Sequence, residues 1–221
     1  MHTIALVGNP NSGKTTLFNV LTGSNQHVGN WPGVTVEKKE GSLKHKGVVY
    51  NVVDLPGTYS LGAYSEDELV ARDFVVKGQP DVVINVVDAT NIDRNLYLTT
   101  QLIEMGAKVV IALNMMDEAH MKEIAISVEV LSKALGVPVI PTVAAKRMGV
   151  DLLLAEAAKT IDHEGKANEV TYSEELDVHI EKMTALLGSV SYPYPTRWIA
   201  LKALEGDVEI LKLIAENKAA K

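Results

Sequence analysis

The chain has no cysteine among its 221 residues, so it can form neither a disulfide framework nor a thiolate metal site. That absence suits a reducing compartment. Long apolar runs are missing as well. The longest, such as 82–87 and 109–113, are far shorter than the roughly 18–20 residues that a membrane helix needs. We therefore expect the chain, as it stands, to be soluble.

Basic residues are scarce, with 21 Lys and Arg against 28 Asp and Glu, for a formal net charge of −7. Proteins that bind nucleic acids usually carry a basic face, so no RNA or DNA partner is expected. The six histidines are scattered without metal-ligand spacing, and they predict no iron site in this chain. A hydrophobic content of 47% is enough for a core of one domain with an appendage, or of two small domains.

Near its N-terminus the chain does contain a phosphate-binding loop pattern, in which Gly8 is followed by four free positions and then Gly13-Lys14-Thr15. The apolar segment 3–7 before it predicts a buried strand, and the segment 14–21 after it predicts a helix. Backbone N–H groups of such a loop converge on an anion, Lys14 adds charge for the terminal phosphates, and Thr15 offers a hydroxyl to Mg²⁺. The predicted nucleoside triphosphate site comprises Gly8, Asn9, Pro10, Asn11, Ser12, Gly13, Lys14, Thr15 and Thr16.

Two further segments have features of nucleotide switches. The segment 24–37 is predicted to be a polar loop, and within it Gly33, Val34 and Thr35 are expected to contact the nucleotide. A threonine in such a loop can coordinate Mg²⁺ and sense the γ-phosphate; alone, Thr35 would simply be a solvated hydroxyl. Asp54 ends an apolar strand, where a Mg²⁺-side carboxylate belongs, and Gly57 offers a backbone N–H to the γ-phosphate. The 58–66 segment that follows is a second candidate for movement.

A guanine-recognition motif follows the strand predicted over 108–113. The Asp117 carboxylate can accept hydrogen bonds from N1–H and the 2-amino group, which guanine has and adenine lacks. The segment 142–146 is expected to close over the base with backbone groups. The residues predicted to contact the base are Asn114, Met115, Asp117, Val143, Ala144 and Ala145.

Strands alternate with helices along most of the chain, with one antiparallel hairpin turning at 45–47. This pattern predicts an α/β fold, a mixed and mostly parallel sheet with helices on both faces and the ligand at the carboxyl ends of the strands. Helices are expected over 66–76, 91–105, 118–135 and 149–161.

The C-terminal part has a different pattern. A polar linker over 163–170 separates a nucleotide-binding domain over 1–162 from a small all-helical domain over 171–221. The latter starts with a capping box at Ser173 and continues with helices expected over 196–204 and 207–217. Its few apolar residues indicate that it packs on the first domain.

Together these motifs are those of the P-loop GTPase superfamily. The stretches 8–19, 29–37 (Gly-Asn-Trp-Pro-Gly-Val-Thr-Val-Glu) and 54–61 closely resemble the cytosolic part of the ferrous-iron transporter B family, FeoB. Tyr194-Pro195-Thr196-Arg197-Trp198 and Leu204-Glu205-Gly206-Asp207 resemble that family's helical domain, so the likeness covers nearly the whole chain.

The resemblance implies a GTPase that uses GTP, GDP and Mg²⁺ and regulates Fe²⁺ uptake. It implies a transmembrane iron-permease domain in the same full-length chain, a position at the cytoplasmic face of the cell membrane, and a homo-oligomer as one expected assembly. Asn11 occupies the position at which potassium-activated members hold K⁺. The residues expected to act in hydrolysis are Asn11, Lys14, Thr35 and Gly57.

Three positions depart from the common GTPase pattern. Thr58 stands where a water-orienting glutamine is found, so intrinsic hydrolysis should be slow. Met115 replaces the more frequent lysine and predicts apolar stacking on the base. Ala144 replaces the more usual serine, so its contact with the base can only be made by the backbone.

Three other functions remain open from the sequence. One is a free-standing GTPase of ribosome or RNA assembly, against which the acidic charge counts. A second is a nucleotide-sensing interaction module that does not hydrolyse GTP, which the missing glutamine permits. An ATP-using kinase is the third, and the guanine-recognition motif disfavours it.

Overall fold

The structure, a computed structural model, describes residues 1–162, 167–188 and 191–219. Within these residues, seven strands form one sheet in the order β2-β3-β4-β1-β5-β6-β7. The pairs β2–β3 and β3–β4 are antiparallel and the others are parallel. The bounds are β1 His2–Gly8, β2 Gln26–Asn30, β3 Glu37–His45, β4 Val48–Asp54, β5 Val82–Asp88, β6 Val109–Asn114 and β7 Val139–Pro141. The predicted mixed, mostly parallel sheet is confirmed.

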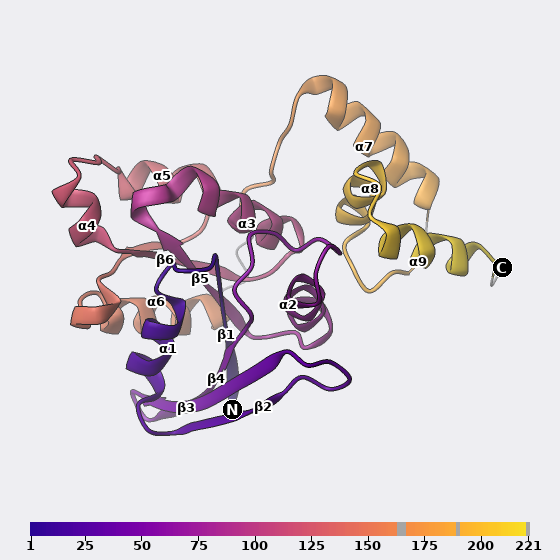
Figure 1. Ribbon diagram of the computed structural model, residues 1–221. Helices are drawn as coiled ribbons and strands as arrows, with labels where there is room; N and C mark the ends of the chain where they lie inside the picture. The colour runs from indigo at the N-terminus through magenta and orange to yellow at the C-terminus, as the bar shows by residue number, and fades with distance from the viewer. Residues whose placement is uncertain (163–166, 189–190, 220–221) are drawn as a thin grey trace.

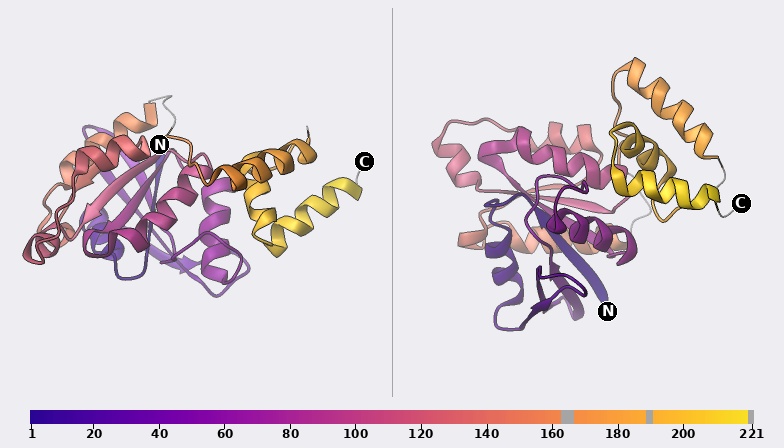
Figure 2. Two further views of the ribbon diagram at one scale, coloured as in Figure 1. Left: turned by 90° about the horizontal axis from the view of Figure 1, so that it is seen from above. Right: turned by 45° about the vertical axis from the view of Figure 1, so that its right-hand side comes forward.

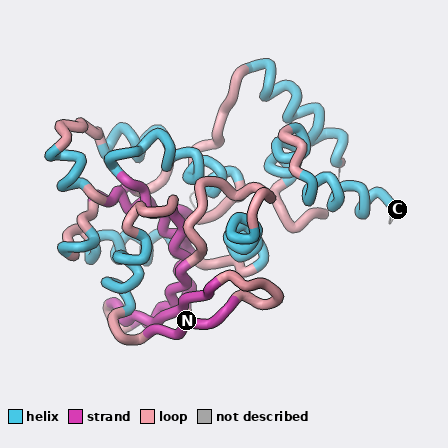
Figure 3. Tube along the Cα trace, in the orientation of Figure 1, coloured by secondary structure: helices cyan, strands magenta, loops and turns pink. Residues whose placement is uncertain are grey.

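Helices cover both faces of this sheet (Figures 1 and 3). Alternate residues of β1 point to opposite faces, so Ile4 and Leu6 belong to one buried cluster and Ala5 and Val7 to the other. The first cluster includes buried residues of α1 and α6, and the second includes buried residues of α2, α3 and α4. Their bounds are α1 Lys14–Thr22, α2 Glu66–Lys77, α3 Ile92–Glu104, α4 Met116–Met121 and α6 Val150–Asp162.

One predicted loop contains a strand. The prediction of a loop over 24–37 is wrong for 26–30, where β2 pairs antiparallel with β3 at the edge of the sheet. All five residues of β2 are exposed, so no alternation of apolar and polar side chains marks it. Backbone hydrogen bonding to β3 makes this segment a strand.

One predicted helix is divided. The sequence predicts a helix within 118–135, whereas the structure has α4 and then α5, Val128–Leu135. Glu123 adopts a φ of 56°, a left-handed conformation that a helix cannot continue through. Helix α5 starts anew at Ser127, whose hydroxyl accepts a hydrogen bond from the Val130 N–H at 3.3 Å.

Three helices make up the C-terminal part of the described chain. They are α7 Glu174–Leu187, α8 Thr196–Leu204 and α9 Val208–Ala219, as the helical pattern predicts. They lie together at one end of the sheet, beside α2 and α3 (Figures 1 and 2). Of the predicted linker over 163–170, residues 163–166 lie outside the described residues, and 167–173 have no regular structure. No helix of the described residues is long and apolar enough to cross a membrane.

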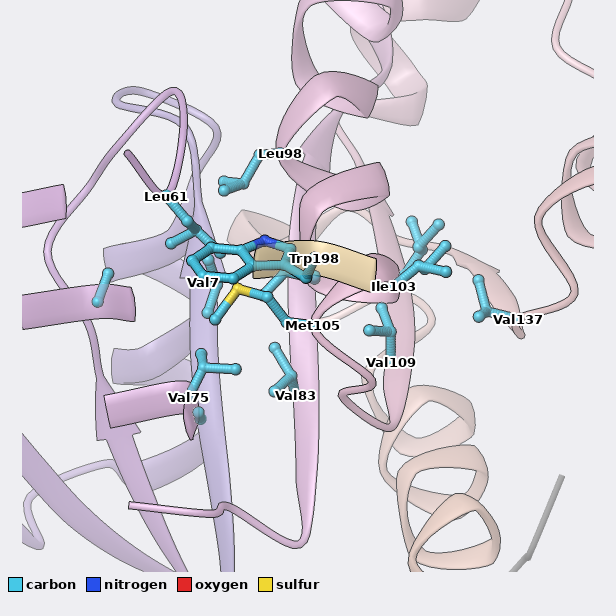
Figure 4. Packing of buried hydrophobic residues seen from close by; sticks show 14 of the residues in the cluster. Val7, Leu61, Val75, Val83, Leu98, Ile103, Met105, Val109, Val137 and Trp198 are labelled. Carbon is cyan, nitrogen blue, oxygen red and sulfur yellow. The ribbon is translucent and has the colours of Figure 1, made fainter. Parts of the chain in front are cut away.

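These helices share a core with the sheet. Trp198 of α8 is 1% exposed and belongs to the same buried cluster as Leu61, Val75 and Met105 (Figure 4). A buried ion pair joins the two parts as well, because Arg72 of α2 lies 3.0 Å from the Asp207 carboxylate between α8 and α9. Asp207 also accepts hydrogen bonds from two N–H groups in the first turn of α9.

Asp207→Ala should therefore lower the free energy of unfolding by about 3 kcal/mol, since it removes the carboxylate that pairs with the buried Arg72 charge. Asp207→Asn keeps an oxygen for the α9 N–H groups and should cost less. Urea denaturation followed by circular dichroism measures both. As a control, Glu209→Gln removes the exposed Glu209–Lys212 pair and should leave the midpoint nearly unchanged. A wild-type midpoint for Asp207→Ala would contradict this account.

Candidate functional site

The phosphate-binding loop lies between the end of β1 at Gly8 and the start of α1 at Lys14, which confirms the predicted strand–loop–helix order. Two residues of the loop, Asn11 and Gly13, have φ values of 66° and 86°. No side chain among the described residues caps α1, so the N–H groups of its first turn are available to bind an anion. Glycine is required at position 13, because a Cβ there would lie 2.2 Å from Asn114 Nδ2.

Two buried polar atoms of this loop have no hydrogen-bond partner within the described part of the chain. They are Asn9 Oδ1 and Ser12 Oγ, and both residues are at most 3% exposed. Buried polar atoms nearly always have a hydrogen-bond partner. Two such atoms without a partner in one loop therefore indicate a place where a polar ligand binds. Pro10 and Asn11 of the loop are exposed, as are Thr15 and Thr16 in the first turn of α1.

Lys14, Asp54 and Gly57 come together at this loop. Lys14 Nζ donates to Asp54 Oδ1, and the two residues are only 8% and 7% exposed. The Thr58 N–H donates to the Gly8 carbonyl at 3.2 Å and so holds the residues after Asp54 against the loop. A Cβ on Gly57 would lie 3.5 Å from Pro10 Cα, which places this glycine beside the loop.

Thr35 does not join this group. It is exposed, in the turn between β2 and β3, which lies near α2 and away from the β1–α1 loop (Figure 1). Trp31 anchors the turn, because its ring lies 5.3 Å from that of Phe74 on α2 and its backbone N–H donates to the Val36 carbonyl at 2.9 Å. Gly33 and Val34 belong to the same turn. In this arrangement Thr35 is not beside Lys14 and Asp54.

Asn114 ties the phosphate-binding loop to the 142–146 segment. It is 3% exposed and donates from Nδ2 to the Ser12 carbonyl at 2.9 Å. Its Oδ1 accepts hydrogen bonds from the Ala144 N–H at 2.9 Å and from Thr142 Oγ1 at 3.4 Å. Met115 follows with a φ of 60° and is the residue immediately before α4. The residues of the predicted base site are thus neighbours of the predicted phosphate site.

Asp117 lies in the first turn of α4, where its carboxylate is 2.7 Å from Lys146 Nζ. This hydrogen bond holds the pKa of Asp117 below its usual value. The carboxylate is therefore ionised at neutral pH and able to accept hydrogen bonds. In the neighbouring segment Val143 and Ala144 are buried, while Ala145 is exposed.

Thr142 and Lys146 are site residues that the sequence motifs do not reveal. Both belong to the segment predicted to close over the base, but their side-chain partners are 28 and 29 residues away along the chain. Only the folded arrangement of β6 and β7 shows these contacts.

The donors at the site are suited to Mg²⁺. No group of three or more His, Cys, Asp or Glu side chains among the described residues could hold a metal ion by itself. The site instead offers the Asp54 carboxylate and the Thr15 hydroxyl, which are hard oxygen donors of the kind that bind Mg²⁺ together with phosphate oxygens.

A cleft of about 1190 Å³ lies beyond the amino ends of β6 and β7, where it is lined by Val109, Val139 and Trp198. Its lining includes neither Asp54 nor Thr15.

Two family models match the chain. One, described as ferrous iron transport protein B, matches residues 2–157, and the other, the FeoB cytosolic helical domain, matches residues 172–221. The Fe(2+) transporter FeoB of Escherichia coli K12 is 47% identical over 214 residues, which cover 93% of this chain and 27% of that protein. The chain thus spans about a quarter of the length of this relative.

Solved structures of related proteins have the same fold. The cytosolic domain of the Thermotoga maritima FeoB iron transporter in its GMPPNP form superposes with a TM-score of 0.93 at 41% identity, over 98% of this chain and 86% of that one. The S. thermophilus NFeoB N11A mutant bound to mGDP gives 0.90 at 46% identity, over 98% and 86%.

Lys146→Met should raise the pKa of the Asp117 carboxyl toward its ordinary value, because the hydrogen bond that lowers it is lost. A pH titration followed by ¹³C NMR of the carboxyl carbon measures this. Because the pKa of Asp117 is lowered in the folded state, the Asp117–Lys146 pair stabilises the fold at pH values above the ordinary pKa of an aspartate. This stabilisation is lost as the pH falls through the lowered pKa. Lys159→Met, at a pair remote from Asp117, is the control. An unchanged titration in Lys146→Met would contradict the assignment.

Proposed function

Because the chain belongs to the FeoB family of ferrous iron transport proteins, we propose that it binds GTP and GDP, hydrolyses GTP slowly, and regulates Fe²⁺ uptake through its nucleotide state. The uptake is proposed for the full-length protein, in which a transmembrane permease domain is the partner and this chain lies at the cytoplasmic face of the membrane. The observation that carries the proposal is the meeting of Lys14, Asp54 and Asn114 at one loop with unpaired polar atoms.

The proposed division of labour follows the two parts of the chain. Residues 1–162 form the nucleotide-binding domain, 163–170 the linker and 171–221 the helical domain. The core that α8 shares with the sheet, and the Arg72–Asp207 pair, support a helical domain that tunes nucleotide release. A homo-oligomer is also proposed as an assembly of the full-length protein.

Lys14 has the central part in phosphate binding. Its ammonium group is paired with Asp54, and a terminal phosphate of higher charge would compete for it. Thr15 and Asp54 would hold Mg²⁺, and Thr35 would join them once the turn between β2 and β3 leaves its contact with α2. When bound, Mg²⁺ neutralises charge on the β- and γ-phosphates. The Gly57 N–H would then face the γ-phosphate.

Hydrolysis is proposed to be slow and activated by K⁺. Thr58 lacks the amide with which glutamine orients water, and its hydroxyl is engaged with Ser60, donating to the carbonyl at 2.6 Å and accepting from the N–H at 3.3 Å. Asn11 is an exposed residue of the phosphate-binding loop, and its side-chain oxygen is a suitable ligand for a monovalent cation. Such a cation would neutralise charge that develops on the phosphates.

The alternative functions lack such support. The E. coli relative is an iron transporter, and the chain carries more acidic than basic residues, which counts against a partner RNA. A module that binds but does not hydrolyse GTP differs from the proposal only in its rate. It would be favoured by a single-turnover rate near zero with K⁺ present.

GTP hydrolysis should be about tenfold or more faster in KCl than in NaCl at equal ionic strength, because K⁺ adds positive charge beside the phosphates. Phosphate release under single-turnover conditions measures both rates. Asn11→Ala should remove most of the difference, while Asn19→Ala, an exposed asparagine of α1, should keep it. Equal rates of the wild-type chain in the two salts would contradict potassium activation.

Asp117→Asn should weaken GDP binding by about a hundredfold, since the carboxylate that accepts N1–H and the 2-amino group is lost. The asparagine amide can instead donate to the 2-oxo group of xanthine, so XDP should now bind better than GDP. Fluorescence titration with labelled nucleotides measures the reversal. Glu118→Gln, its exposed neighbour, should preserve the wild-type preference. A variant that still prefers GDP would contradict the role of Asp117.

A further inference from the structure

One face of α3 contacts the 58–66 segment that follows Gly57. Arg94 and Gln101 are seven residues apart, close to two helical turns, so they lie on the same face. The Arg94 guanidinium lies 3.9 Å from the centre of the Tyr59 ring. Gln101 Oε1 accepts a hydrogen bond from the Leu61 N–H at 2.6 Å. The segment is therefore held at two points by one helix.

Helix α3 is itself firmly fixed. Thr99 Oγ1 donates to Asn85 Oδ1 of β5 at 2.5 Å, and Asn95 Oδ1 accepts from the Asp88 N–H at 3.1 Å. Near its start, the Arg94 carbonyl accepts from Asn9 Nδ2 of the phosphate-binding loop at 3.4 Å. The same helix thus connects the phosphate-binding loop with the segment after Gly57.

Among the contacts between α3 and the 58–66 segment, the hydrogen bond from the Leu61 N–H to Gln101 is buried. Gln101 is 3% exposed and Leu61 is fully buried, so water cannot replace the amide oxygen. A buried backbone N–H that loses its acceptor is costly, and the chain would move to satisfy it. At the outer side of the segment Glu68 accepts from Ser60 Oγ at 2.6 Å and from the Tyr64 N–H at 3.0 Å, in more exposed surroundings.

We propose that Gln101 is a positioning residue for GTP hydrolysis, one that fixes the backbone at Leu61 so that the Gly57 N–H keeps its orientation toward the terminal phosphate. This inference rests on the proposed function. Since Thr58 cannot orient water with its side chain, the reaction depends on backbone groups in this segment, and a small displacement lowers its rate. GDP has no γ-phosphate for the Gly57 N–H to contact, so its affinity does not depend on Gln101.

Two variants of nearly equal length separate the hydrogen bond from packing. Gln101→Met fills the same space but offers no oxygen to the Leu61 N–H. Gln101→Glu keeps an oxygen acceptor at the same distance along the side chain. Single-turnover and steady-state GTP hydrolysis in KCl give kcat and KM, and fluorescence titrations give the affinities for GDP and GMPPNP. Melting temperatures show that each variant is folded.

Gln101→Met should lower kcat by about tenfold and weaken GMPPNP, while GDP affinity stays within about twofold of the wild type. Gln101→Glu should restore most of kcat. Loss of the buried hydrogen bond lowers the melting temperature in either case, but a purely structural role would weaken GDP and GMPPNP alike. A wild-type kcat and wild-type GMPPNP affinity in a folded Gln101→Met variant would overturn the inference.

Nucleotide binding and GTP hydrolysis by the wild-type chain distinguish a wrong role for Gln101 from a wrong proposed function. A wild-type chain that binds no guanine nucleotide would overturn both. A wild-type chain that binds GMPPNP but does not hydrolyse GTP would overturn the proposed activity and, with it, the part of Gln101 in hydrolysis. If Gln101→Met does not fold, Gln101→Asn, which draws the amide back by one methylene, should show the same selective loss of kcat, and its wild-type kcat would overturn the inference.

Discussion

The site depends on the parallel arrangement of β1 with β4 and β5, and of β5 with β6. Because the carboxyl ends of parallel strands lie at one edge of a sheet, Gly8, Asp54 and Asn114 come together although they are far apart in sequence. The contacts between them are direct. Lys14, which follows the loop, pairs with Asp54, and Asn114 donates to the loop at Ser12. A change in strand order would separate all three.

The Lys14–Asp54 pair fixes the Lys14 ammonium group beside the Asp54 carboxylate. Two buried charges side by side avoid the penalty that either would incur alone, yet such a pair adds little net stability. It can therefore be exchanged for another pairing at small cost. In our account a phosphate replaces Asp54 as the partner of Lys14, and the Asp54 carboxylate then binds Mg²⁺. Nucleotide binding and the exchange of this ion pair therefore occur together.

The sequence predicts the parts of this site whose chemistry is local. The loop at 8–15, the carboxylate at Asp54 and the asparagine at 114 are each marked by a buried strand that ends in the required residue. β2 could not be predicted, because an exposed edge strand has no apolar pattern. Lys146 and Gln101 could not be predicted either, since their partners are 29 and 40 residues away and the contacts depend on how helices and strands pack.

The central claim is that Lys14 and its neighbours bind guanine nucleotides through the phosphates and the base together. Calorimetric titration of the chain with GDP and with ADP, repeated with Lys14→Ala, tests it most directly. We predict saturable binding of GDP, binding of ADP weaker by about a hundredfold or more, and loss of GDP binding in the variant. Equal affinities for the two nucleotides, or undiminished GDP binding in Lys14→Ala, would contradict the account.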